Sequence, residues 1–229
     1  VSTVLMTAIP AQVAGVAEIV LCTPPQPDGS VADGLLGAFH SLGLTNVFLI
    51  GGAQAIGAMA YGTRTIPPVD MVAGPGNAFV MEAKRQVFGR VGVDLLPGPS
   101  ELMVIADEGA NPEWVAADLL SQAEHGTGKE KLYLAVPSRS FWEKVSSEMD
   151  CQLSGIENRQ SLTGILDTGF LVGICETMED TIAFANSVAP EHLELQVAAG
   201  SIDALSRKIT TAGAILQGYQ TPTVLGDFV

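Results

Sequence analysis

The feature that most constrains the fold is the regular alternation of short apolar runs with segments of helical periodicity. The runs that predict strands cover residues 18–22, 47–50, 102–106, 131–136, 169–174 and 214–217. Most of the segments between them carry apolar residues three and four positions apart, a spacing typical of amphipathic helices. Strands joined through a helix run parallel, because the crossover returns the chain to the same edge of the sheet. The pattern therefore predicts an α/β protein with mainly parallel sheets.

A stiff loop near residue 100 is the best place for a domain boundary. Two prolines, Pro97 and Pro99, bracket Gly98 directly before one of the predicted strands. We therefore expect two domains, residues 1–103 and 104–229. The chain starts at Val1, in mid-pattern and without a methionine, so we expect it to be a piece of a longer protein.

Charge and cysteine content narrow the range of partners. The formal net charge of −14 disfavours nucleic acid and anionic membranes, because their phosphates would be repelled. No apolar run reaches the length of a membrane span. The three cysteines lie far apart without a Cys-x-x-Cys pair, which is typical of reduced thiols. We therefore expect a cytoplasmic protein with no nucleic acid or membrane partner.

Gln122 and His125 form the first candidate site. They lie three residues apart near the end of a predicted helix, so both side chains leave the same helix face. An amide oxygen and an imidazole side by side can hold a cation or a polar ligand. Taken alone, however, such a pair is more typical of a solvated or capped helix end, so other parts of the chain must decide.

A second candidate is the pair Glu191 and His192, which follows Pro190 in a loop that leads into a strand. A carboxylate and an imidazole on a stiff loop suit general acid–base chemistry, because imidazole exchanges protons near neutral pH. Glutamate–histidine pairs are also common on ordinary surfaces. Asp227, near the end of the chain, could add an oxygen ligand. His40 lies in a predicted helix without acidic neighbours, which indicates a structural or surface residue.

Two glycine-rich turns, at residues 51–54 and 74–77, each follow a predicted strand and precede a predicted helix. Backbone amides at such turns can bind phosphate oxygens. Neither turn has the Gly-x-Gly-x-x-Gly spacing, so ordinary tight turns remain an equal alternative.

Several longer motifs, in order along the chain, resemble those of the histidinol dehydrogenase family. They are Gly-Gly-Ala-Gln-Ala-Ile at 51–56, Gly-Pro-Gly-Asn at 74–77, Ala-Lys-Arg-Gln-Val-Phe-Gly at 83–89, Gly-Pro-Ser-Glu at 98–101, Ala-Ala-Asp-Leu-Leu-Ser-Gln-Ala-Glu-His at 116–125 and Ala-Pro-Glu-His-Leu-Glu at 189–194. The resemblance covers the whole chain but only the central portion of the family's usual length. It implies two Rossmann-like doubly wound domains, the second incomplete.

The resemblance also implies an activity, the oxidation of L-histidinol to L-histidine through the aldehyde in two NAD-dependent steps with zinc bound. It makes Gln122, His125 and Asp227 zinc ligands. The family's fourth zinc ligand, a histidine of the partner subunit, would lie beyond Val229. The implied assembly is therefore a homodimer with a shared active site.

The remaining roles follow from the same motifs. Glu191 and His192 resemble the acid–base pair, and Ser100 resembles a substrate contact. The zinc ligands and His192 would also contact the substrate. Gln54 and Asn77 resemble contacts to NAD. Zinc accepts such nitrogen and oxygen ligands, and it would chiefly orient the substrate.

Two alternatives remain open. A related zinc- and NAD-dependent enzyme could act on another polyol, such as a sulfonated propanediol; Ser100 mildly favours histidinol over it. A non-catalytic α/β binding module could retain the motifs. The presence of all five of the residues expected to bind zinc or exchange protons disfavours that module, because a scaffold needs none of them.

Overall fold

The chain divides into two compact units, Val1–Gly98 and Pro99–Val229. The structure, a computed structural model, describes residues 1–96, 98, 100–124, 129–156 and 159–227, without the side chains of residues 160, 161 and 227. The boundary between the units lies at residues 98 and 99, a few residues before the predicted boundary after residue 103. A boundary after residue 103 would divide strand β5, which begins at Glu101.

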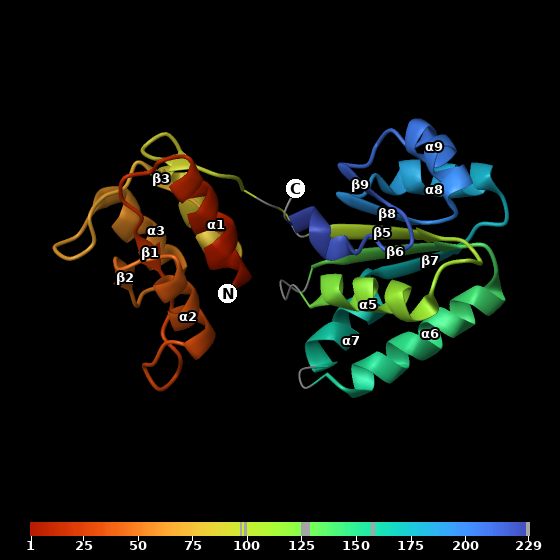
Figure 1. Cartoon of the computed structure of the whole chain (residues 1–229), viewed down its shortest axis with the longest axis horizontal. Coiled ribbons are helices and arrows are strands. Elements are labelled where there is room, and N and C mark those ends of the chain that lie inside the picture. Colours follow the sequence, from red (N-terminus) through yellow and green to blue (C-terminus); the bar gives the residue numbers. More distant parts are fainter. Residues whose placement is uncertain (97, 99, 125–128, 157–158, 228–229) are drawn as a thin grey trace. The chain divides into compact units, whose positions relative to one another are not determined.

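The first unit consists of short strands between helices (Figure 1). In chain order its elements are α1 (Ser2–Val13), β1 (Leu21–Cys22), α2 (Asp33–Ser41), β2 (Val47–Phe48), α3 (Gly52–Tyr61), β3 (Met71–Val72), α4 (Ala78–Val87) and β4 (Gly92–Val93). Strand β1 pairs with β2 and β3 with β4, both in parallel. Helices α3 and α4 pack against each other, and the buried Ile56, Val72 and Val87 belong to one hydrophobic cluster.

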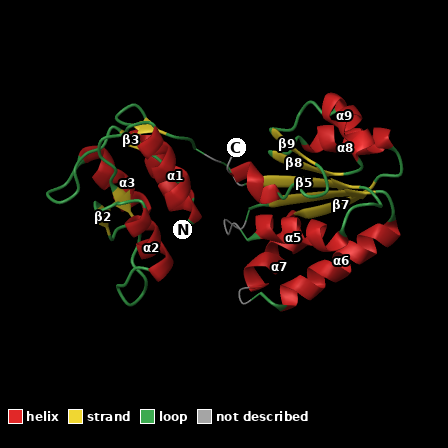
Figure 2. Cartoon of the chain, in the orientation of Figure 1, coloured by secondary structure: helices red, strands yellow, loops and turns green. Residues whose placement is uncertain are grey.

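The second unit contains a continuous parallel sheet with helices on both faces (Figure 2). Its elements are β5 (Glu101–Ala106), α5 (Pro112–Ala123), β6 (Lys131–Val136), α6 (Arg139–Ser154), α7 (Arg159–Gly169), β7 (Phe170–Ile174), α8 (Met178–Val188), β8 (His192–Gln196), α9 (Ala199–Lys208), β9 (Ala214–Gln217) and the 3-10 turn η1 (Thr223–Asp227). The strand order is β7-β6-β5-β8-β9. This is the doubly wound arrangement, so the predicted α/β fold with parallel sheets is confirmed.

Strand β5 shows how the second unit divides its core between the two sheet faces. Leu102 and Val104 belong to the cluster that includes α5, α6 and α7, whereas Met103 and Ile105 belong to the cluster with α8 and α9. Successive side chains of a strand leave opposite faces, so an uninterrupted apolar run fits only a strand covered on both sides. The two helix layers of Figure 1 provide that cover.

The helices between the strands begin where the sequence places capping residues. Asn111 accepts a hydrogen bond from the Glu113 backbone N–H at the start of α5, and Thr177 accepts one from Asp180 at the start of α8. Such caps satisfy N–H groups that have no partner within the helix. None of the described helices combines the length and apolar character that crossing a membrane requires.

Candidate active site

One face of strand β8 carries a row of polar side chains in an otherwise apolar sheet. Leu193 and Leu195 point into the cluster beneath α8 and α9. His192, Glu194 and Gln196 have the opposite parity and therefore share the other face. Glu194 and Gln196 are buried, with 0% and 1% of their surface exposed, and His192 is half-buried. Buried polar groups are costly unless they are hydrogen-bonded, so this row requires partners.

Asp118 of α5 and Thr223 of η1 supply those partners. The Gln196 amide donates from Nε2 to Glu194 Oε1 at 2.6 Å and to Asp118 Oδ2 at 3.2 Å. Thr223 donates its backbone N–H to Asp118 Oδ1 at 3.1 Å and its hydroxyl to Glu194 Oε2 at 3.1 Å. Each carboxyl oxygen of the pair thus accepts one bond, and Gln196 and Thr223 each bridge both carboxyl groups.

The two carboxyl groups of this network differ in how they hold protons. Burial and, to a smaller extent, the neighbouring charge of Asp118 together raise the pKa of Glu194 to about 8. Burial also raises the pKa of Asp118, against the lowering effect of hydrogen bonds from Thr223 and Glu194. Two carboxylates this close cannot both be ionised in a buried site. At neutral pH Glu194 therefore stays protonated, and its O–H group donates a hydrogen bond to Asp118.

The two hydrogen bonds of the Gln196 amide nitrogen carry a free-energy cost at the amide oxygen. This oxygen, Oε1, is buried and has no hydrogen-bond partner within the part of the chain that the structure describes. If the amide were rotated by half a turn, its oxygen would face the oxygens of the two carboxyl groups. The amide nitrogen therefore faces them and donates one N–H to each carboxyl group. A buried unpaired oxygen costs about 1–3 kcal/mol, which the network must offset.

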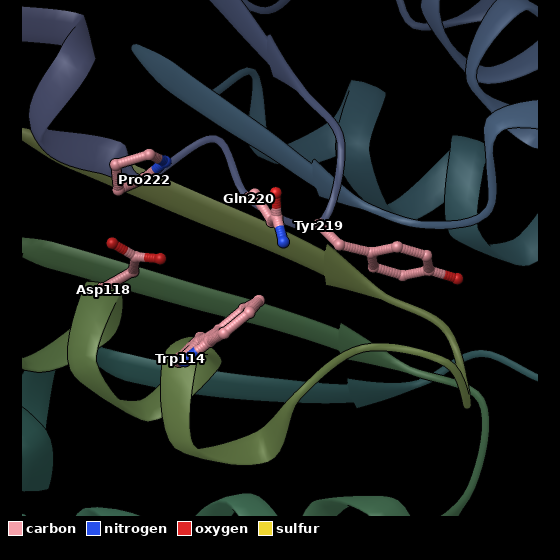
Figure 3. A pocket seen from close by; sticks show the side chains of 5 residues that line it. All are labelled: Trp114, Asp118, Tyr219, Gln220 and Pro222. Atoms are coloured by element: carbon pink, nitrogen blue, oxygen red, sulfur yellow. The ribbon is translucent and has the colours of Figure 1, made fainter.

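A pocket of about 340 Å³ lies between α5 and the loop after β9 (Figure 3). Its lining includes Trp114, Asp118, Tyr219, Gln220 and Pro222. The Tyr219 hydroxyl donates to Asp107 at 2.8 Å, which anchors this loop beside the carboxyl end of β5. Asp118 therefore borders the pocket as well as the buried network.

The turn η1 lies against His192. It packs on α5, β8 and β9, and a Cβ added at Gly226 would stand 3.1 Å from His192 Nε2. A side chain at this position would force the imidazole to shift by a few tenths of an ångström, so glycine suits this close approach. Asp227 follows directly, and its backbone belongs to η1 while its side chain lies outside the described part of the structure.

The expected acid–base pair sits where strands β5 and β8 begin. His192 is the first residue of β8 and is paired with Leu102 and Ala214 in the neighbouring strands. Glu191 is exposed, and its Oε2 accepts a hydrogen bond of 3.3 Å from the Glu101 backbone N–H. These residues occupy the amino ends of the strands, whereas ligands of doubly wound folds usually bind at the carboxyl ends.

Ser100 and Gln122 are the other predicted residues of the second unit whose side chains the structure describes. Ser100 directly precedes β5, and its carbonyl accepts a bond of 3.3 Å from the Lys131 N–H at the start of β6. Gln122 is 1% exposed in the last turn of α5. His125 lies outside the described residues. Within the described residues, no cluster of three histidine, cysteine, aspartate or glutamate side chains could hold a metal ion.

Gln54 and Asn77 both lie in the first unit, at the beginning of α3 and α4. The Asn77 side-chain oxygen accepts hydrogen bonds from the N–H groups of Phe79 and Val80, each at 3.1 Å. Asn77 is therefore the N-cap of α4. Its amide nitrogen remains the group that could donate to a ligand.

A buried lysine anchors the turn that leads to Asn77. Lys84 is 0% exposed; its ammonium contacts Asp94 Oδ1 at 2.6 Å and donates to the Gly74 carbonyl. Asp94 also accepts a bond of 2.8 Å from the Gly74 N–H. Burial acts to raise the pKa of Asp94, but the hydrogen bonds from Gly74 and Lys84 outweigh it and lower the pKa.

Sequence reasoning missed the network of Asp118, Glu194, Gln196 and Thr223. The available signal was the His-Leu-Glu-Leu-Gln alternation of residues 192–196. On a sheet covered by helices on both faces, polar residues at every second position indicate a buried polar row. Read without that cover, the same alternation is typical of an ordinary strand with one solvated face.

The sheet order and the two helix layers define the second unit as a doubly wound α/β unit, and strand β8 adds a buried row of polar side chains to it. A model of the histidinol dehydrogenase family matches residues 1–229. The chain therefore belongs to the histidinol dehydrogenase family.

Two curated relatives and one solved structure illustrate the similarity. Histidinol dehydrogenase of Thermosynechococcus vestitus is 47% identical over 228 residues, which are 100% of this chain and 52% of the relative. The enzyme of Halalkalibacterium halodurans is 46% identical, over 99% of this chain and 53% of the relative. The crystal structure from Elizabethkingia anophelis is 40% identical with a TM-score of 0.87, covering 99% of this chain and 52% of that one. The chain thus spans about half the length of these relatives.

Proposed function

We propose that this chain is the central part of an enzyme that oxidises L-histidinol to L-histidine through the aldehyde, with NAD and zinc. The proposal rests on family membership and on one observation, the placement of His192 between the Glu191 loop and the turn that ends in Asp227. An exposed carboxylate and a half-buried imidazole at one edge of a sheet suit proton transfer at a substrate. A cytoplasmic homodimer with a shared active site is part of the proposal.

The donor types of the expected ligands fit zinc. Gln122, His125 and Asp227 offer an amide oxygen, an imidazole and a carboxylate, and such nitrogen and oxygen donors are ordinary zinc ligands. Amide and carboxylate ligands hold zinc less tightly than thiolates, which suits a site that also binds substrate. When bound, zinc would orient the amine and imidazole of histidinol, and NAD would accept the hydride.

The residues of this chain perform the proton transfers. His192 Nε2 takes the proton of the substrate alcohol while the carbon–hydrogen bond breaks. Glu191, held by the N–H of Glu101, accepts a proton from the water that adds to the aldehyde. Ser100 contacts the substrate beside them. Gln54 and the side-chain amide nitrogen of Asn77 contact NAD.

The decisive experiment measures NADH formation by the full-length protein with L-histidinol and, separately, with dihydroxypropanesulfonate. Turnover of histidinol alone supports the proposal, and turnover of the sulfonate alone would replace it with the related polyol oxidation. Absence of turnover with both, while zinc and NAD are bound, would favour a binding module.

A histidine variant tests the role of the acid–base pair. His192→Ala should abolish turnover with zinc retained, because this side chain moves protons and is not a ligand in the proposal. His40→Ala, on the exposed face of α2, is the matched control and should keep full activity. Loss of zinc from His192→Ala, measured by metal analysis, would show that His192 is a ligand instead.

A further inference from the structure

Neither the residues expected to bind zinc nor the acid–base pair explains why Asp118, Glu194, Gln196 and Thr223 are buried together. All four are at most 9% exposed, and they join α5, β8 and η1. Within the described part of the chain, the hydrogen bonds of this network join the four residues to one another rather than to the reacting groups proposed above. The network therefore requires a reason of its own.

The geometry of Thr223 suggests that reason. Thr223 is the first residue of η1, and it is bonded twice, through its backbone N–H to Asp118 and through its hydroxyl to Glu194. Three residues later, Gly226 lies against the imidazole of His192. His192 and Glu194 share one face of the same strand. The network therefore fastens the turn to the strand at one end of η1, and the turn meets His192 near its other end.

We propose that Asp118 and Glu194, bridged by Gln196 and Thr223, are positioning residues that hold the turn 223–227 against His192. This proposal deepens the proposed function and rests on it for its consequence, since the same turn presents Asp227. A loosened turn would displace the Asp227 carboxylate relative to His192, and it would weaken zinc binding without removing any ligand.

The state of the carboxyl pair supports this role. With Glu194 protonated, the pair carries one negative charge and offers four oxygens to four N–H and O–H donors on Gln196 and Thr223. The unpartnered Gln196 Oε1 shows that the amide is oriented for this purpose although its own oxygen is left without a bond within the described residues. Such a network has one arrangement in which every donor is used, so it determines where Thr223 sits.

Thr223→Val is the sharpest test in the full-length protein. It keeps the side-chain shape and the backbone bond to Asp118 but removes the hydroxyl bond to Glu194. Thr223→Ser restores a hydroxyl and should rescue. Thr221→Val, two residues earlier in the same loop, removes a hydroxyl bond of 2.7 Å to the Gln217 carbonyl and is the matched control. Removing Asp118 or Glu194 itself risks unfolding, so neither is used here.

Two measurements read out these variants, namely hydrogen exchange of the 223–227 amides and zinc affinity by chelator competition. In Thr223→Val we expect exchange at the Thr223 and Leu225 amides to rise about tenfold and zinc affinity to fall about 10- to 100-fold, the range for residues that orient ligands. The Michaelis constant for NAD should not change, because Gln54 and Asn77 lie in the other unit. Thr223→Ser and Thr221→Val should resemble the wild type in both measurements.

The outcomes separate this proposal from the function on which it rests. Unchanged exchange at 223–227 in Thr223→Val would overturn the positioning role, whatever the zinc affinity. Faster exchange with unchanged zinc affinity would support the positioning of the turn and remove Asp227 from the set of zinc ligands. Faster exchange together with weaker zinc binding supports both.

Discussion

Two turns of this protein are anchored by pairs of ionisable side chains, and the two pairs are opposite in kind. In the first unit the turn that leads to Asn77 is held by Lys84 and Asp94, a pair of opposite charges. In the second unit the turn 223–227 is held by Asp118 and Glu194, two acids that share a charge. The charge of a carboxylate can be neutralised by a counter-ion or by a proton. The first unit uses a counter-ion for Asp94, and the second unit uses a proton on Glu194.

Because of this difference, the stabilising contributions of the two anchors change with pH in opposite directions. The pKa of Asp94 is lowered by folding, so its contribution is present above the unfolded pKa and is lost as pH falls through the folded value. The pKa of Glu194 is raised to about 8, so its contribution is present below the unfolded pKa of about 4.3 and is lost as pH rises towards 8. Acid should loosen the first anchor, and mild alkali the second.

The first anchor is tested by removing its counter-ion. Lys84→Met removes the two bonds of the buried ammonium and leaves Asp94, whose side chain is 22% exposed, without its counter-ion, which should cost the first unit about 1–3 kcal/mol. Hydrogen exchange of α4 amides under native conditions measures this cost. Arg85→Met, at the next position but in an exposed pair with Glu82, is the control and should change nothing measurable. Equal effects of the two variants would show that the buried pair does not anchor the turn.

The second anchor is tested by pH. Relative to Glu194→Gln, the wild-type second unit should lose about 1.4 kcal/mol of stability per pH unit between about pH 4.5 and 8, because its folded state binds the additional proton. Urea unfolding followed by tryptophan fluorescence measures this, since both tryptophans, Trp114 and Trp142, lie in the second unit. Glu191→Gln, an exposed site beside the same strand, should keep the wild-type slope. Parallel pH curves for wild type and Glu194→Gln would refute the shared proton.

The smallest expected effect on stability comes from Asn77, which caps α4 next to the turn that Lys84 and Asp94 hold. Asn77→Ala removes the cap of α4 and should cost about 1 kcal/mol, whereas Asn77→Ser keeps a capping oxygen and should cost only a few tenths. The same exchange measurement applies. Because Asn77→Ser also removes the side-chain amide nitrogen, the proposed contact to NAD predicts weaker NAD binding, which calorimetry on the full-length protein would detect. If serine were as costly to stability as alanine, the cap would not be what Asn77 contributes.

Local patterns in the sequence predicted the second unit better than the first. The strands expected at residues 131–136 and 214–217 and the helix expected to span residues 178–188 have those bounds in the structure. In the first unit the strands expected at 18–22 and 47–50 shorten to Leu21–Cys22 and Val47–Phe48. A strand forms only as far as a neighbour pairs with it, and the partners in the first unit are two residues long.

Local sequence patterns could predict only some of the roles that the structure shows for the candidate site residues. Asn77 was expected to contact NAD, and its capping of α4 could have been read from its position before a helix. The approach of Gly226 to His192 could not, because the residues lie far apart in the sequence and meet only through the register of β8 and the path of η1.

The sequence by itself determined most of the helices and strands of the second unit, the parallel α/β class and the family, because these depend on residue spacing within short windows and on ordered motifs. Only the tertiary structure decided that Glu194 is an acid that keeps its proton. The pKa of Glu194 depends on how completely α5, β8 and η1 exclude water and on the nearby Asp118, whose position in the chain is remote. Burial and register are long-range properties, and they convert an ordinary alternation of residues into an anchored site.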